Sequence, residues 1–164
     1  MLKSGIYWDY IGKSGIMEYL STLDDKGRIS LPVRIRESFK ESHIILTKGF
    51  PSSVWVFLPS EWEAFSQNLL KSANQSFTEQ LKIQRQFFAP MIEIEIDKAG
   101  RVAISQSLRD FAGLGRDCRI LEVVNHLEIW DSEQYKAYEK ANEAEIQEVL
   151  EKMGPAALFS GSPR

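Results

Sequence analysis

The 164-residue chain has few of the residues that form disulfides or metal sites. It contains one cysteine, Cys118, and two histidines, His43 and His126. A single cysteine excludes an internal disulfide and is typical of proteins in a reducing compartment. The histidines lie far from each other and from the cysteine, without metal-ligand spacing. We therefore expect no metal ion or other cofactor, and we expect each histidine to be a partly buried structural residue.

Long apolar runs are also absent. No uninterrupted stretch approaches the ~18 residues that a membrane-spanning helix needs. The N-terminus lacks the basic start, apolar core and small-residue cleavage site of a signal peptide. A hydrophobic share of 43% and a charged share of 26% are typical of a soluble globular protein. We expect a cytoplasmic protein with no membrane partner.

Enzyme motifs are missing as well, and no G-x-S-x-G nucleophile motif occurs. Glu93 and Glu95 could form a carboxylate pair, because residues two apart share one face of a strand. The simpler interpretation is that they form the solvent face of an amphipathic strand. Four aromatic residues are assigned to a core or an interface and not to base stacking: Trp62, Phe65, Phe87 and Phe88. We expect the protein not to be an enzyme.

What the sequence does contain is a repeated turn. The pattern D-x-x-G-R occurs at residues 24–28 and again, 73 residues later, at 97–101. The residues after each turn also match, 29–31 with 102–104 and 35–37 with 108–110. Gly27 can adopt the positive φ that such a turn requires. Two copies are too few for a stacked array, so the pattern indicates a duplication.

Each copy is expected to form two strands, a short helix, two further strands and a final helix. In the first copy, alternating or apolar runs predict strands at 17–23, 28–31, 44–46 and 54–58, with a short helix from Pro32. Ser60 with Glu63, and Ser76 with Glu79, predict capping boxes for two helices, the second of which ends near Phe88. These two helices have no counterpart at the same point of the second copy.

In the second copy, strands are expected at 91–96, 101–104, 118–124 and 127–130. The short helix between them is expected to be capped by Ser105 and to end at Gly113. Asp131 with Gln134 predicts the start of the last helix.

One unit of this kind is too small and too rich in free strand edges to be stable alone. Two units related by an approximate twofold axis can interleave their strands into one small barrel. The predicted fold class is α+β, mainly β, with helices outside the strands. The expected segments are an N-terminal extension (1–16), a first unit (17–63), a helical spacer (64–89), a second unit (90–134), a C-terminal helix (135–153) and a flexible tail (154–164).

The net charge of −3 does not by itself favour a nucleic-acid partner. Residues 26–48, however, contain six basic side chains and two acidic ones. A local basic face, and not the total charge, determines where a polyanion binds. A solvated surface with scattered arginines is the open alternative.

The segment TLDDKGRISLP, its echo IDKAGRVAI and the SEW start of the following helix resemble the MraZ family, bacterial regulators built from two tandem SpoVT-AbrB-type units. The resemblance runs from about Met17 to Tyr138, and Met17 stands where the family usually has glycine. It implies a double-split β-barrel with helices packed outside. It also implies a nucleoid-associated transcriptional regulator that binds double-stranded DNA at short repeats upstream of the cell-division and cell-wall operon. A further implication is a ring-shaped homo-oligomer that presents several D-x-x-x-R loops at once.

The chemistry of the loop supports DNA binding independently. Arginine has a planar guanidinium that matches a guanine edge or a phosphate with two hydrogen bonds. An aspartate four residues earlier can orient that group, and neighbouring basic side chains can contact phosphates. The candidate DNA-binding residues are Asp24, Lys26, Gly27, Arg28, Arg34, Arg36, Asp97, Gly100 and Arg101. Arg28 is preferred over Arg101, because the first copy has more basic neighbours in sequence.

Two alternatives remain open at this stage. The Asp–Arg pairs could be ion pairs that only stabilise the turns. The chain could also be an antitoxin-like interaction module whose C-terminal helix binds another protein, because AbrB-type units also occur in antitoxins. Those antitoxins normally carry one unit and a disordered C-terminal arm, whereas this chain has two units and a capped final helix.

Overall fold

A computed structural model describes residues 18–39, 43–72, 76–123 and 125–159. The expected N-terminal extension lies outside these residues. The chain divides into two compact units, one ending at Ser132 and one beginning at Glu133, which are described separately. None of the described helices is both long enough and apolar enough to cross a membrane.

The elements follow the order that the repeat predicts. The first copy contains β1 (Glu18–Thr22), β2 (Arg28–Ser30), α2 (Val33–Ser38), β3 (His43–Lys48), β4 (Val54–Phe57) and α3 (Pro59–Lys71). A further helix, α4 (Phe77–Phe87), separates the copies. The second copy contains β5 (Ile92–Glu95), β6 (Arg101–Ala103), α5 (Gln106–Ala112), β7 (Asp117–Val123), β8 (His126–Asp131) and α6 (Ser132–Phe159).

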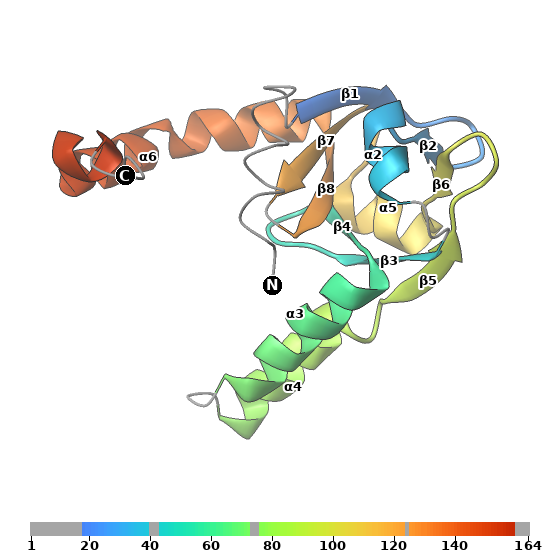
Figure 1. The fold of residues 1–164 in the computed structure, drawn as a ribbon, viewed down its shortest axis with the longest axis horizontal. Coiled ribbons are helices and arrows are strands. Elements are labelled where there is room, and N and C mark those ends of the chain that lie inside the picture. Colours follow the sequence, from blue (N-terminus) through green and yellow to red (C-terminus); the bar gives the residue numbers. More distant parts are fainter. Residues whose placement is uncertain (1–17, 40–42, 73–75, 124, 160–164) are drawn as a thin grey trace. The chain divides into compact units, whose positions relative to one another are not determined.

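The strands of the two copies are interleaved, as the sequence predicts. Six antiparallel strands form one sheet in the order β1-β7-β8-β4-β3-β5, and β2 pairs with β6 in a separate two-stranded ribbon (Figure 1). The first strand of each copy therefore pairs with the other copy, β1 with β7 and β5 with β3. If each strand is replaced by its counterpart in the other copy, the result is the same strand order read from the opposite edge of the sheet. The sheet therefore has an internal twofold pattern.

The predicted closure into one barrel is not seen in the strand pairing. Among the described residues the strands form these two sheets, joined by an isolated bridge between Leu23 and Ile29. Both sheets nevertheless share one core. Ile29 and Val102 of the ribbon are fully buried in the same cluster as Ile44 and Ile120 of the large sheet. Burying such apolar side chains is the main contribution to folding free energy.

The helices α3 and α4 pack against the sheet through aromatic side chains and extend away from it side by side (Figure 1). Trp62 contacts Phe57 of β4 and Phe88, with ring centroids 5.4 and 5.7 Å apart. Phe65 contacts Phe87 at 5.4 Å. Edge-to-face contacts of this kind stabilise the packing beyond the area they bury. The expectation that these aromatic residues belong to a core is therefore confirmed.

Helix boundaries confirm some of the predicted caps and correct others. Ser76 and Glu79 form the predicted capping box of α4, and Ser105 caps α5, which ends at Gly113 in a left-handed conformation. The predicted capping box of Ser60 is wrong, because α3 begins at Pro59 without a side-chain cap. Proline has no N–H to satisfy at the first helical position, so the helix begins one residue earlier.

The last helix extends beyond the expected boundary at residue 153. Helical structure continues to Phe159, with one break at Gly154, whose φ is 74°. The first five residues after the break, expected in a flexible tail, are helical, and residues 160–164 lie outside the described part of the chain. The break fits the sequence Gly-Pro, because glycine adopts positive φ readily and proline is accepted at the start of a helix.

Candidate nucleic-acid interface

In the first turn, one aspartate holds both the backbone and the arginine. Oδ1 of Asp24 accepts hydrogen bonds from the backbone N–H groups of Lys26 and Arg28, both at 2.9 Å. Oδ2 accepts from Nε of Arg28, also at 2.9 Å. Gly27 has a φ of 76°, and its N–H donates to the carbonyl of Asp24. The aspartate thus fixes the turn and the direction of the arginine side chain together.

The second turn repeats this geometry closely. Asp97 accepts from the backbone N–H groups of Ala99 and Arg101 at 2.9 and 2.8 Å. Its other oxygen accepts from Nε of Arg101 at 2.8 Å, and Gly100 has a φ of 75°. Both predicted Asp–Arg pairs are therefore present in the structure. The alternative that these pairs serve only to hold the turns stays a prediction.

After the bonds that hold the turns, each arginine still has hydrogen-bond donors available. Of the guanidinium nitrogens, each carboxylate accepts a hydrogen bond only from Nε. The terminal nitrogens of Arg28 and Arg101 make no hydrogen bond within the described residues. Their side chains are 28% and 35% exposed. Each arginine is consequently oriented on one edge and open to a ligand on the other.

The same bonds keep both aspartates ionised. The backbone N–H of Arg28 is the largest influence and lowers the pKa of Asp24 below its ordinary 3.8, against a smaller opposing effect of desolvation. The backbone N–H of Arg101 lowers the pKa of Asp97 in the same way. At neutral pH both carboxylates are charged and hold their arginines.

The ribbon β2–β6 brings the two turns to one surface. Arg28 pairs with Ala103, and Ser30 pairs with Arg101. Paired residues of an antiparallel ribbon point to the same side, so both arginines lie on one face, while Ile29 and Val102 are buried on the other. Diagonal neighbours of this type have Cα atoms roughly 7–8 Å apart. The sequence pattern places the turns 73 residues apart and did not predict this juxtaposition.

The predicted basic neighbours lie in different places. Lys26 is exposed beside Arg28 in the first turn, and Arg34 is partly exposed on α2, where it has a partner. Arg36 was expected beside the first turn. Its Nε donates to the carbonyl of Leu31 at 2.7 Å, and its guanidinium lies against Gly100 of the second turn.

Two further basic residues lie at the turns and were missed. Arg109 of α5 places its guanidinium against Gly27 of the first turn, and Lys98 is exposed in the second turn. The repeat contained the signal for Arg109, because this residue matches Arg36 at the same 73-residue shift. Arg36 of the first copy lies at the second turn, and Arg109 of the second copy lies at the first turn. The second turn therefore has as many basic neighbours as the first.

The residues with catalytic or metal-binding chemistry are arranged differently. No group of three or more His, Cys, Asp or Glu side chains in the described ranges could hold a metal ion. Burial raises the pKa of the Cys118 thiol to about 11, so the thiol is protonated at neutral pH. His126 is nearly buried between Trp55 and Phe57. His43 is 53% exposed beside Glu93 and Glu95, so the prediction that it is partly buried is wrong.

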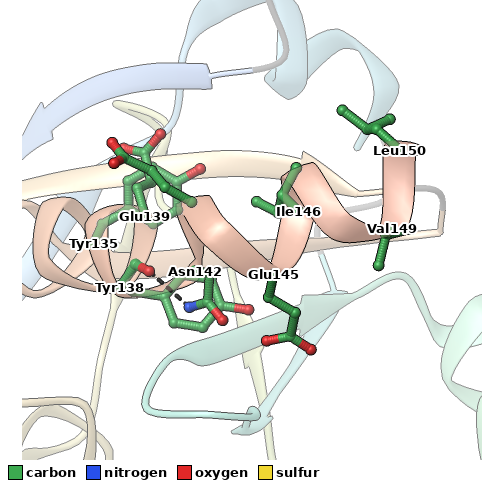
Figure 2. A pocket seen from close by; sticks show the side chains of 9 residues that line it. Tyr135, Tyr138, Glu139, Asn142, Glu145, Ile146, Val149 and Leu150 are labelled. Carbon is green, nitrogen blue, oxygen red and sulfur yellow. Dashed lines mark hydrogen bonds between the residues drawn. The ribbon is translucent and has the colours of Figure 1, made fainter. Parts of the chain in front are cut away.

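The helix α6 carries a groove of its own. Figure 2 shows its lining side chains, including Ile146, Val149 and Leu150, and a hydrogen bond from Asn142 to the carbonyl of Tyr138 (2.7 Å). The three aliphatic side chains are 44–53% exposed. Exposed apolar side chains that are grouped on one helix face are typical of interaction surfaces.

Comparison with known proteins identifies the repeat. A family model described as "MraZ protein, putative antitoxin-like" matches the chain twice, at residues 17–86 and 87–154. The first match includes α3 and all but the last residue of α4, and so covers most of the segment 64–89 that the sequence predicts as a spacer.

Curated proteins named "Transcriptional regulator MraZ" are similar over most of the chain. The protein of Treponema denticola is 40% identical over 137 residues, which cover 84% of this chain and 95% of that protein. The protein of Treponema pallidum (strain Nichols) is 38% identical over 128 residues, with coverage of 78% and 86%. The protein of Symbiobacterium thermophilum is 35% identical over 137 residues, with coverage of 84% and 98%.

Proposed function

The chain belongs to the MraZ family, and from this premise we propose that it is a sequence-specific, DNA-binding transcriptional regulator. Its target would be short promoter repeats upstream of the cell-division and cell-wall operon, as the family resemblance implies. The protein would then act in the cytoplasm, associated with the nucleoid.

One observation carries this proposal: two arginines, each oriented by an aspartate, lie on the same exposed face of a two-stranded ribbon. The major groove of B-DNA admits a two-stranded β-ribbon. Guanine presents two acceptors there, O6 and N7, and an arginine can contact both at once. Because Asp24 and Asp97 already hold the Nε edges, the terminal nitrogens are directed without further loss of side-chain freedom on binding.

Phosphate contacts would come from the basic side chains around this face. Lys26 and Lys98 are exposed at the two turns, and Arg34 lies on the adjacent helix. Contacts of this kind fix the position of the protein on the duplex without selecting a sequence. They also make the affinity depend steeply on salt.

A single ribbon neutralises few phosphates and would bind weakly. We propose that a ring-like homo-oligomer presents several ribbons to tandem repeats, because linked weak sites gain affinity through a high effective concentration. A monomeric variant that binds the promoter as tightly as the assembly would contradict this part of the proposal.

We also infer that the two sheets close into the double-split β-barrel of the family. The support is the shared core, in which the ribbon and the large sheet bury their apolar faces together. The bridge between Leu23 and Ile29 joins the two sheets at one corner.

The test is fluorescence anisotropy of a labelled DNA fragment from upstream of the protein's own operon, titrated at several salt concentrations. We expect Arg28→Ala and Arg101→Ala each to weaken binding roughly 5- to 150-fold, which is the range for losing one bidentate base contact. Because the turns have equal geometry, the two losses should be similar. Arg85→Ala on α4 is the control, since this exposed arginine lies outside the ribbon and its turns. Unchanged binding in folded Arg28→Ala and Arg101→Ala proteins would contradict the proposal.

The groove on α6 supports a second candidate, an antitoxin-like module that binds another protein. Ile146, Val149 and Leu150 are exposed and line this groove, where a partner helix could cover them. An affinity purification that yields a stoichiometric protein partner and no DNA would favour this candidate. Loss of that partner in an Ile146→Asp variant would locate it on α6.

A further inference from the structure

The glycines of the two turns are each covered by an arginine from the other copy. A Cβ atom built on Gly27 would collide with Nη1 and Cζ of Arg109, which belongs to α5 of the second copy. A Cβ atom on Gly100 would collide with Nε, Cδ and Cζ of Arg36, which belongs to α2 of the first copy. Only glycine leaves room for a guanidinium to lie this close to the backbone.

Backbone hydrogen bonds also connect the two copies at these two glycines. The N–H of Leu31 donates to the carbonyl of Gly100 at 2.9 Å, and the N–H of Ile104 donates to the carbonyl of Gly27 at 2.9 Å. Each D-x-x-G-R turn is therefore held by hydrogen bonds to its own aspartate and by a backbone hydrogen bond and an arginine from the other copy.

The two arginines are themselves held in place. Nε of Arg36 donates to the carbonyl of Leu31 at 2.7 Å. Nη2 of Arg109 donates to Oε1 of Gln106 at 2.6 Å, and the amide of Gln106 donates to Asp110 at 2.7 Å. A guanidinium restrained at one side and packed on a peptide at the other can hold a turn in one geometry.

We propose that Arg36 and Arg109 are crossed positioning residues, each of which holds the DNA-contacting turn of the opposite copy. Arg109 supports Arg28 through Gly27, and Arg36 supports Arg101 through Gly100. This inference rests on the proposed DNA binding and changes the assignment of Arg36. Its main role is to shape the second turn, whereas the sequence had suggested a phosphate contact beside the first.

A double-mutant cycle in the anisotropy assay tests the crossed pairing. We expect Arg109→Ala to weaken DNA binding about 10-fold, and to add less than about twofold when Arg28→Ala is already present. The same Arg109→Ala change should remain fully additive with Arg101→Ala. For Arg36→Ala the pattern should be reversed, with coupling to Arg101 and additivity with Arg28.

Two readouts separate a positioning residue from a phosphate contact. Loss of a phosphate contact lowers the salt slope of log Kd by about one, whereas loss of a positioning residue leaves that slope unchanged. Lysine keeps the charge but not the planar group, so Arg109→Lys should lose nearly as much affinity as Arg109→Ala. A salt slope that falls by one, or a lysine variant with full affinity, would overturn the inference.

A measurement without DNA distinguishes this inference from the proposed function. In amide NMR spectra we expect Arg109→Lys to shift the Gly27 signal and leave Gly100 unchanged, and Arg36→Lys to do the opposite. If the parent protein binds no DNA but these shifts occur, the proposed function fails and the crossed contacts hold. If the parent binds DNA but the cycles are additive in all combinations, only the crossed pairing is wrong.

Discussion

The two copies agree closely at their turns and differ in the helices after their fourth strands. The matched hydrogen bonds of the two turns differ in length by at most 0.2 Å, and their glycines differ by one degree in φ. After the fourth strand, the first copy continues into α3 and α4, whereas the second continues into the long α6. The turn is determined by bonds among five neighbouring residues, so a duplicated sequence reproduces it. The helices after the fourth strands differ in number and length, and α3 and α4 have aromatic packing partners in the sheet.

Removing a large buried aromatic side chain from the first copy, Trp62, should sharpen this comparison most. We expect Trp62→Ala to lower the free energy of unfolding by about 3–5 kcal/mol, because the indole is buried against Phe57 and Phe88. Chemical denaturation measures this loss. Leu70→Ala on the same helix is the control and should change stability by less than about 0.5 kcal/mol, since Leu70 is exposed. DNA affinity of the folded Trp62→Ala protein should match the parent, and a large loss would show that the helices and the turns are not independent.

A β-carbon at the turn glycines should have a smaller and equal effect in the two copies. Gly27→Ala and Gly100→Ala should each cost about 1–2 kcal/mol of unfolding free energy, because alanine is strained at positive φ. Each would also displace the arginine of the opposite copy and reduce DNA affinity. Gly154→Ala is the matched control, with a φ of 74° and no atom within 4 Å of the new Cβ. If only one of the two substitutions lowers the unfolding free energy, the two turns have the same structure but do not contribute equally to stability.

Acid titration should produce the smallest difference. The folded-state pKa values of Asp24 and Asp97 lie below the ordinary 3.8, so these groups stabilise the protein above that pH. This stabilisation is lost as the pH falls through the lowered values. We expect the unfolding free energy of Asp24→Asn and Asp97→Asn to depend less on pH below about 4 than that of the parent. Parallel curves for parent and variants between about pH 2 and 5 would contradict the expected contribution.

Local patterns predicted much of the fold. The repeat, the turns, the caps at Ser76 and Ser105 and the order of elements depend on residues close in sequence, and they are observed as expected. The interleaving of the strands of the two copies was also predicted, because one unit alone is too small and too rich in free edges to be stable. The exposure of His43 was missed, because the residues beside it, Glu93 and Glu95, come from a strand far along the chain. The continuation of α6 to Phe159 was missed, because Gly-Pro predicts a helix end, whereas here it is a break inside the helix.

The location of Arg36 is the most instructive feature that sequence proximity did not predict. It lies eight residues after Arg28, so sequence proximity assigned both to one site. Because the copies exchange strands, the helix that comes after one turn lies over the other turn. A rule that adds charges from neighbouring residues fails in this interleaved fold. The repeat alignment of Arg36 with Arg109 indicates that the two arginines occupy equivalent places at the two turns.

The exchange of first strands also has a consequence for synthesis of the protein on the ribosome. β1 pairs with β7, so Glu18 lies opposite a residue that is translated about 100 positions later, Leu121. At typical elongation rates this interval lasts on the order of 5–20 s. During that time the nascent β1 has apolar side chains and a free edge but no partner strand, and β2 lacks its partner until β6 is translated. The large sheet can therefore be completed only when β7 and β8 emerge, and until then the unpaired strand edges can aggregate.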